Sequence, residues 1–71
     1  MKLTIEQTKK LLSGNQEFKQ FGFAMMLTRL RTKYSRDPSQ ETLQTSMDEI
    51  NVFLEKFASI MANDFAIISQ L

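Results

Sequence analysis

The chain has 71 residues, nine basic and eight acidic side chains, and a formal net charge of +1. It contains no cysteine and no histidine, which excludes disulfides and thiolate metal sites and removes the commonest general base. A chain this short forms one domain with a marginal core, and such domains usually gain stability from a disulfide, a metal or a second subunit. The composition therefore favours a single domain, residues 1–71, that forms an oligomer and holds no metal and no cofactor.

The first expected helix covers residues 4–13. Thr4 is followed three residues later by Gln7, a spacing typical of a capping box at a helix N-terminus. At the other end, Gly14 suits a helix C-cap and Asn15 suits the next N-cap. Only two glycines and one proline interrupt the whole chain, and long period-two alternation is absent, so the remaining sequence also predicts helix.

The strongest turn signal lies at residues 35–39. Asp37 suits an N-cap, Pro38 the first helical position, and Gln40 the third. Glu41 then places negative charge near the positive end of the helix dipole. These positions predict that a second helical segment begins directly after Asp37.

The turn divides the chain into two arms, residues 4–36 and residues 38–71, of nearly equal length. As continuous helices, each arm would be about 50 Å long. The predicted fold is all-α: a helical hairpin, with or without a kink at Gly14, that assembles as a dimeric helical bundle. If the chain breaks fully at 13–15, the first helix folds back and a three-helix bundle results.

The second arm carries apolar residues at alternating spacings of four and three, which is a heptad seam. The seam consists of Leu43, Met47, Ile50, Leu54, Phe57, Met61 and Ile68. Asp64 occupies the one polar seam position, either hydrated at the rim or buried at an interface, with Lys9 or Lys10 as a partner. From residue 52 onward the apolar face spans roughly 240°, which one neighbouring helix cannot cover.

The first arm contains an unbroken apolar run, residues 21–27, that is typical of a helix enclosed on all sides. Two hairpins packed as a four-helix bundle would enclose it. The residues predicted to form an oligomer or partner interface are Phe18, Phe21, Met25, Leu27, Leu54, Phe57, Ile60, Met61, Phe65 and Ile68. The alternatives are ordinary core packing and a methionine-rich groove for a target helix.

Charge is distributed unevenly between the arms. Residues 1–36 carry eight basic and two acidic side chains, a net charge of +6, and residues 37–71 carry one basic and six acidic, a net charge of −5. Complementary pairing of the arms, within or between chains, is the simpler explanation. The alternative is a nucleic-acid contact, because Arg29, Lys33 and Arg36 share one helix face and could track phosphates.

The sequence predicts binding rather than catalysis. It has no glycine-rich phosphate loop, and the adjacent Asp48 and Glu49 point about 100° apart on a helix and form no dyad. The N-terminus does not resemble a signal peptide, and residues 52–71 contain too many polar groups for a bilayer span. We therefore expect a cytoplasmic, homodimeric, non-enzymatic protein-interaction or regulatory module without catalytic residues. The alternatives are a dimeric helical nucleic-acid-binding protein and a small component of a phage, plasmid or secretion assembly.

Overall fold

A computed structural model describes residues 2–71. Within that range the chain is entirely helical apart from its connections, which confirms the predicted all-α class. The α-helices are α1 (Ile5–Ser13), α2 (Phe21–Arg36), α3 (Gln40–Lys56) and α4 (Ala62–Ile68), and the 3₁₀ helix η1 (Ala58–Ile60) lies between the last two. No helix of this described range combines the length and apolar character needed to cross a membrane.

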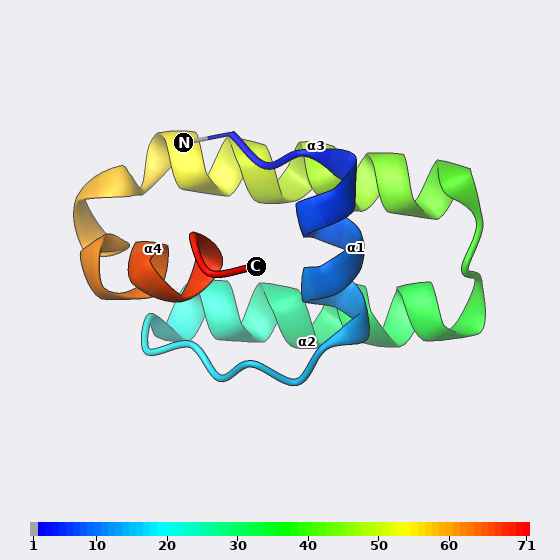
Figure 1. Cartoon of the computed structure of the whole chain (residues 1–71), viewed down its shortest axis with the longest axis horizontal. Helices are drawn as coiled ribbons and strands as arrows, with labels where there is room; N and C mark the ends of the chain where they lie inside the picture. The colour runs from blue at the N-terminus through cyan, green and yellow to red at the C-terminus, as the bar shows by residue number, and fades with distance from the viewer. Residues whose placement is uncertain (1) are drawn as a thin grey trace.

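The helices α2 and α3 lie antiparallel and form a hairpin whose connection, residues 37–39, falls within the predicted turn (Figure 1). The short helix α1 crosses between them and contacts both. Figure 1 shows α4 on the same side of the hairpin as α1, beside the start of α2. Since the longest dimension is 31 Å, the prediction of two unbroken arms of about 50 Å is wrong.

The start of α1 follows the predicted capping box. The Gln7 backbone N–H donates to Thr4 Oγ1 (3.1 Å), and the Thr4 N–H donates to Gln7 Oε1 (3.0 Å). Gly14 is the C-cap, as predicted. Asn15 is not the next N-cap, because residues 14–20 stay non-helical and α2 begins only after Gln20.

The start of α3 lies two residues later than predicted. Ser39 is the N-cap, and its Oγ accepts from the Thr42 N–H at 3.1 Å. Asp37 instead ends α2, since its own N–H donates to the Lys33 carbonyl (3.0 Å). Aspartate and serine cap helices equally well, and Ser39 serves here because Asp37 is already the C-cap of α2. Glu41 lies in the first turn of α3, as predicted.

The core collects apolar side chains from every α-helix. Its buried members are Leu3, Leu11, Leu12, Phe23, Leu27, Leu30, Leu43, Ile50, Leu54, Met61 and Ile68. The Phe23 ring is central, with centroids 4.9 Å from Phe18 and 5.5 Å from Phe53. The predicted seam of the second arm therefore supplies most of its residues to the core of its own chain.

Two seam residues lie outside the core: Met47 is partly buried, and Phe57 is 43% exposed. Phe57 is also the residue at which α3 ends, with φ −118° and ψ 29°. The chain then turns through η1, and α4 buries Met61 and Ile68 against the remainder of the fold. The 240° apolar face expected for one continuous helix is thus divided between two helices.

Leu54→Ala should lower the free energy of unfolding by about 2–5 kcal/mol, because it leaves a cavity in the closed core. Phe57→Ala removes a larger but exposed side chain of the same seam and should cost less than about 1 kcal/mol. Urea denaturation followed by circular dichroism measures both changes. Equal losses in the two variants would show that Phe57 is enclosed.

Candidate functional site: the open face of the hairpin

Asp64 fixes the position of α4. Its side chain is 1% exposed, and its two carboxylate oxygens accept the backbone N–H groups of Lys19 (2.8 Å) and Gln20 (2.9 Å). Both donors directly precede α2, where the helix dipole favours negative charge. The predictions of a hydrated Asp64 and of pairing with Lys9 or Lys10 are therefore wrong, because backbone groups at a helix end compensate the buried charge.

Arg31 secures α1 and the loop that follows it on the same side. The Arg31 Nε donates to the Leu11 carbonyl (3.0 Å) in the last turn of α1, and Nη1 donates to the Gln16 carbonyl (3.2 Å). Burial lowers the pKa of the guanidinium, which still remains charged at neutral pH. Arg31 is thus a structural cation, whereas its neighbours Arg29 and Lys33 lie on a different face of α2.

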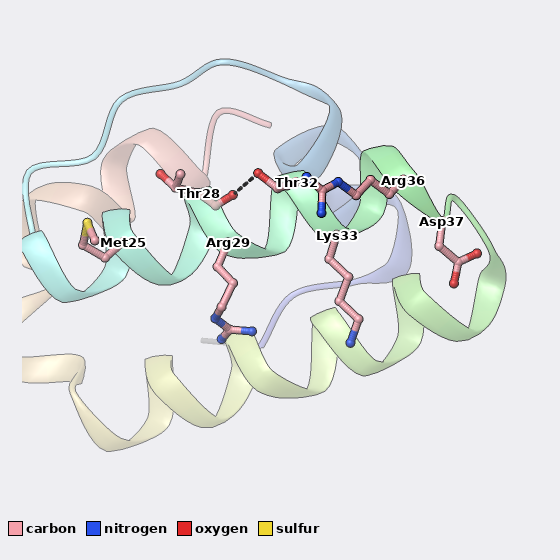
Figure 2. Close-up of a pocket in the computed structure, with 7 residues that line it drawn as sticks. All are labelled: Met25, Thr28, Arg29, Thr32, Lys33, Arg36 and Asp37. Carbon is pink, nitrogen blue, oxygen red and sulfur yellow. Dashed lines mark hydrogen bonds between the residues drawn. The ribbon is translucent and has the colours of Figure 1, made fainter.

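The other side of the α2–α3 hairpin has no covering element in the described chain. Figure 2 shows Arg29 and Lys33 extending from α2 toward α3, with α1 and α4 behind the hairpin. On α3, Asn51 marks the covered side, because its Oδ1 accepts the Leu3 N–H at 2.7 Å. We call the uncovered side the open face. Its exposed residues are Met25, Arg29, Lys33 and Arg36 on α2 and Glu41, Thr45, Asp48, Glu49 and Val52 on α3.

A hollow of about 540 Å³ follows the α2 part of the open face (Figure 2). It is lined by Met25, Thr28, Arg29, Thr32, Lys33, Arg36 and Asp37. The two threonine hydroxyls donate to carbonyls of their own helix, Thr28 to Ala24 (3.0 Å) and Thr32 to Thr28 (3.1 Å). The charged side chains are therefore the groups of this hollow best placed to bind something.

The predicted nucleic-acid triplet does lie together on α2, but its members differ in their partners. Arg29 forms an ion pair with Glu49 across the hairpin. Within residues 2–71, Lys33 and Arg36 have no carboxylate within 4.0 Å. Close pairing inside the chain therefore uses one basic side chain of the triplet. Of the pairing expected within or between chains, the described residues therefore show one close ion pair between the basic and the acidic arm.

A second exposed region, the apolar end, lies where α2 begins and α3 ends. It consists of Phe21, Phe57 and Ile60, of which Phe21 is 75% exposed. The Phe53 ring lies beneath, 4.7 Å from the Phe57 ring and next to Gly22. Within one chain only the Phe23 and Leu27 side of α2 is covered, so the predicted enclosure of residues 21–27 on all sides would need a second chain.

The residues predicted to form an interface are thus divided into three groups. Leu27, Leu54, Met61 and Ile68 are buried in the core, and Phe18 and Phe65 are partly buried against it. Phe21, Met25, Phe57 and Ile60 are exposed. Helical spacing placed these apolar residues on shared helix faces. It did not indicate which faces would be buried within the chain and which would stay exposed.

Asp64→Asn should lower the free energy of unfolding by about 1–3 kcal/mol, because the amide nitrogen would face a backbone N–H and leave a buried donor unpaired. Glu55→Gln, the same change at an exposed position of α3, should alter stability by less than about 0.5 kcal/mol. Thermal and urea unfolding of the two variants provides the comparison. Similar stability in both would mean that the Asp64 contacts contribute little.

Comparison with protein-family models, with curated proteins and with solved structures finds no match to this chain. Across residues 2–71, no three acidic, histidine or cysteine side chains gather in a way that could hold a metal ion. The open face and the apolar end together expose Phe21, Met25, Val52, Phe57 and Ile60.

Proposed function

We propose that the protein is a non-enzymatic protein-interaction module that acts as a homo-oligomer. The observation that carries this proposal is the exposure of large apolar side chains, led by Phe21 at 75%. Met25, Val52, Phe57 and Ile60 are also about half exposed or close to it. Transfer of such side chains from water into an interface is favourable by about 25 cal/mol per Å², and grouped exposed apolar residues are typical of interaction sites.

The polar residues best suited to chemistry serve the fold instead. The Asp64 carboxylate is fully engaged by backbone N–H groups, and the Arg31 guanidinium is engaged by Leu11 and Gln16. The sequence also lacks histidine and cysteine. These observations support a binding role, in which the exposed surface does the work and the buried polar groups hold the helices in place.

Nucleic-acid binding is the second candidate, because Lys33 and Arg36 have no carboxylate partner within 4.0 Å in the described chain. The rest of the open face argues against it. Three cations on α2 lie beside Glu41, Asp48 and Glu49 on α3, so a phosphate backbone that follows α2 would meet carboxylates one helix away. A face of mixed sign suits a protein partner better than a polyanion.

The wild-type protein should be a dimer or a higher oligomer at micromolar concentration, because the exposed apolar residues gain free energy when they leave water. Sedimentation equilibrium at several loading concentrations gives the mass directly. A folded species that keeps the single-chain mass of 8.3 kDa at every concentration would contradict the proposal.

The wild-type protein should bind DNA and RNA only weakly, and replacement of Arg29, Lys33 and Arg36 by glutamine should leave that weak affinity unchanged. Loss of the exposed Arg29–Glu49 pair should reduce stability by roughly 0–1 kcal/mol. Fluorescence anisotropy with labelled duplex DNA and single-stranded RNA, at low and at physiological salt, measures the binding. Tight and steeply salt-dependent binding by the wild type, abolished in the triple variant, would make nucleic-acid binding the function.

A further inference from the structure

We propose that a second copy of the chain docks on the open face, with the two hairpins related by a two-fold axis parallel to α2 and α3. In this arrangement α2 of each protomer packs against α3 of the other, and the four long helices form one bundle. The inference rests on the proposed function, since it names the partner and the face through which the protein forms an oligomer.

The hairpin of α2 and α3 is covered on one side only. The helices α1 and α4 occupy the same side (Figures 1 and 2), held there by Arg31 and Asp64 respectively. The open face presents Met25 and Val52, each more than half exposed. These two apolar side chains lie among charged residues of both signs, and a two-helix layer with one side uncovered can bury them against a second layer.

Two contacts define the register between α2 and α3. Gly22 lies against Phe53, and Arg29 pairs with Glu49. Continued toward the turn, this register brings the end of α2 level with the start of α3. Rotation about a two-fold axis parallel to the helices does not change the position of a residue along that axis. Each α2 residue therefore lies opposite the α3 residues of the partner that correspond to its own neighbours on α3.

In the docked arrangement, this register brings complementary residues together. On α2, the residues that would meet the partner are Met25, Arg29 and Arg36, spaced by four and then seven positions. On α3, Val52, Asp48 and Glu41 have the same spacings in the reverse direction along the sequence. The docked helices are antiparallel, so the two series coincide. Met25 meets Val52 of the partner subunit, Arg29 meets Asp48 of the partner subunit, and Arg36 meets Glu41 of the partner subunit. Symmetry repeats each contact once.

The charge distribution favours a second copy over an unrelated acidic helix. An acidic partner would match α2 but would be repelled by Glu41 and Asp48 on the adjacent α3. A second copy presents both signs in the required order. Within the described chain, the basic and acidic arms share one close ion pair. Docking of a second copy also places the basic arm of each protomer along the acidic arm of the other.

The test exchanges charge at one predicted contact. Arg36→Glu alone and Glu41→Arg alone each place like charges opposite one another at both symmetry-related sites of a homodimer. Each should raise the dimer dissociation constant about tenfold. An equimolar mixture of the two single variants should form heterodimers with an affinity near that of the wild type. In the mixed dimer, the introduced glutamate faces the introduced arginine, and the native Arg36 faces the native Glu41.

The mixture is decisive because pairing within one chain cannot produce rescue in trans. Sedimentation velocity with one variant fluorescently labelled measures the mixed species. Val52→Lys should abolish dimerisation. Because Val52 is exposed in the single chain, the variant should remain folded, which circular dichroism verifies. Ile5→Lys changes an exposed aliphatic residue of α1, on the covered side, and should leave the dissociation constant unchanged.

Dissociation constants that do not respond to Arg36→Glu and Glu41→Arg, or a mixture without rescue, would overturn this interface. If those variants remain dimeric while Phe21→Ser with Ile60→Ser gives a monomer, the protein associates through the apolar end. The proposed function then stands and the interface assigned here is wrong. A wild type that is monomeric at all concentrations would overturn both.

Discussion

The contact between Asp64 and the residues that precede α2 determines how the second half of the chain is used. A carboxylate with 1% exposure would be costly to bury without partners. Here the N–H groups of Lys19 and Gln20, each within 2.9 Å, satisfy both oxygens at the positive end of the α2 dipole. Because the anion is stabilised at that one place, α4 turns back along the hairpin rather than continuing α3 into solvent.

The consequence for packing is that α1 and α4 both cover one side of the hairpin. Met61 and Ile68 become part of the protein's own core, and Arg31 secures the α1 end of the same side through the Leu11 and Gln16 carbonyls. The opposite side of α2 and α3 retains its cations, its carboxylates and two exposed apolar side chains. Because α1 and α4 both pack on the same side of the hairpin, the opposite side is left uncovered, and this is the surface proposed for association.

Local rules predicted the parts of this fold that depend on a few neighbouring residues. The capping box at Thr4, the Gly14 C-cap and the turn before α3 follow from side-chain chemistry at fixed offsets. Heptad spacing correctly identified Leu43, Ile50 and Leu54 as buried. These features were predictable because each is determined within one or two helical turns.

The features that were not predicted depend on contacts distant in the sequence. The helix α3 ends at Phe57 although no glycine or proline marks that position. The free energy that favours this break comes from burying Met61 and Ile68 elsewhere in the fold. Asp64 resembled a rim or interface charge, since nothing in its own helix indicates two backbone donors 44 and 45 positions earlier. For the same reason, spacing alone could not show that Phe21 would be exposed.

The central claim, that the open face packs against the same face of a second copy, is tested most directly by nuclear Overhauser effects between protomers. In a mixture of isotope-labelled and unlabelled chains, an isotope-filtered experiment selects contacts between the two. The arrangement predicts transfer from the Met25 methyl group of one protomer to the Val52 methyl groups of the other. Intermolecular transfer that involves Phe21 and Ile60 instead, or none in a sample that sediments as a dimer, would contradict it.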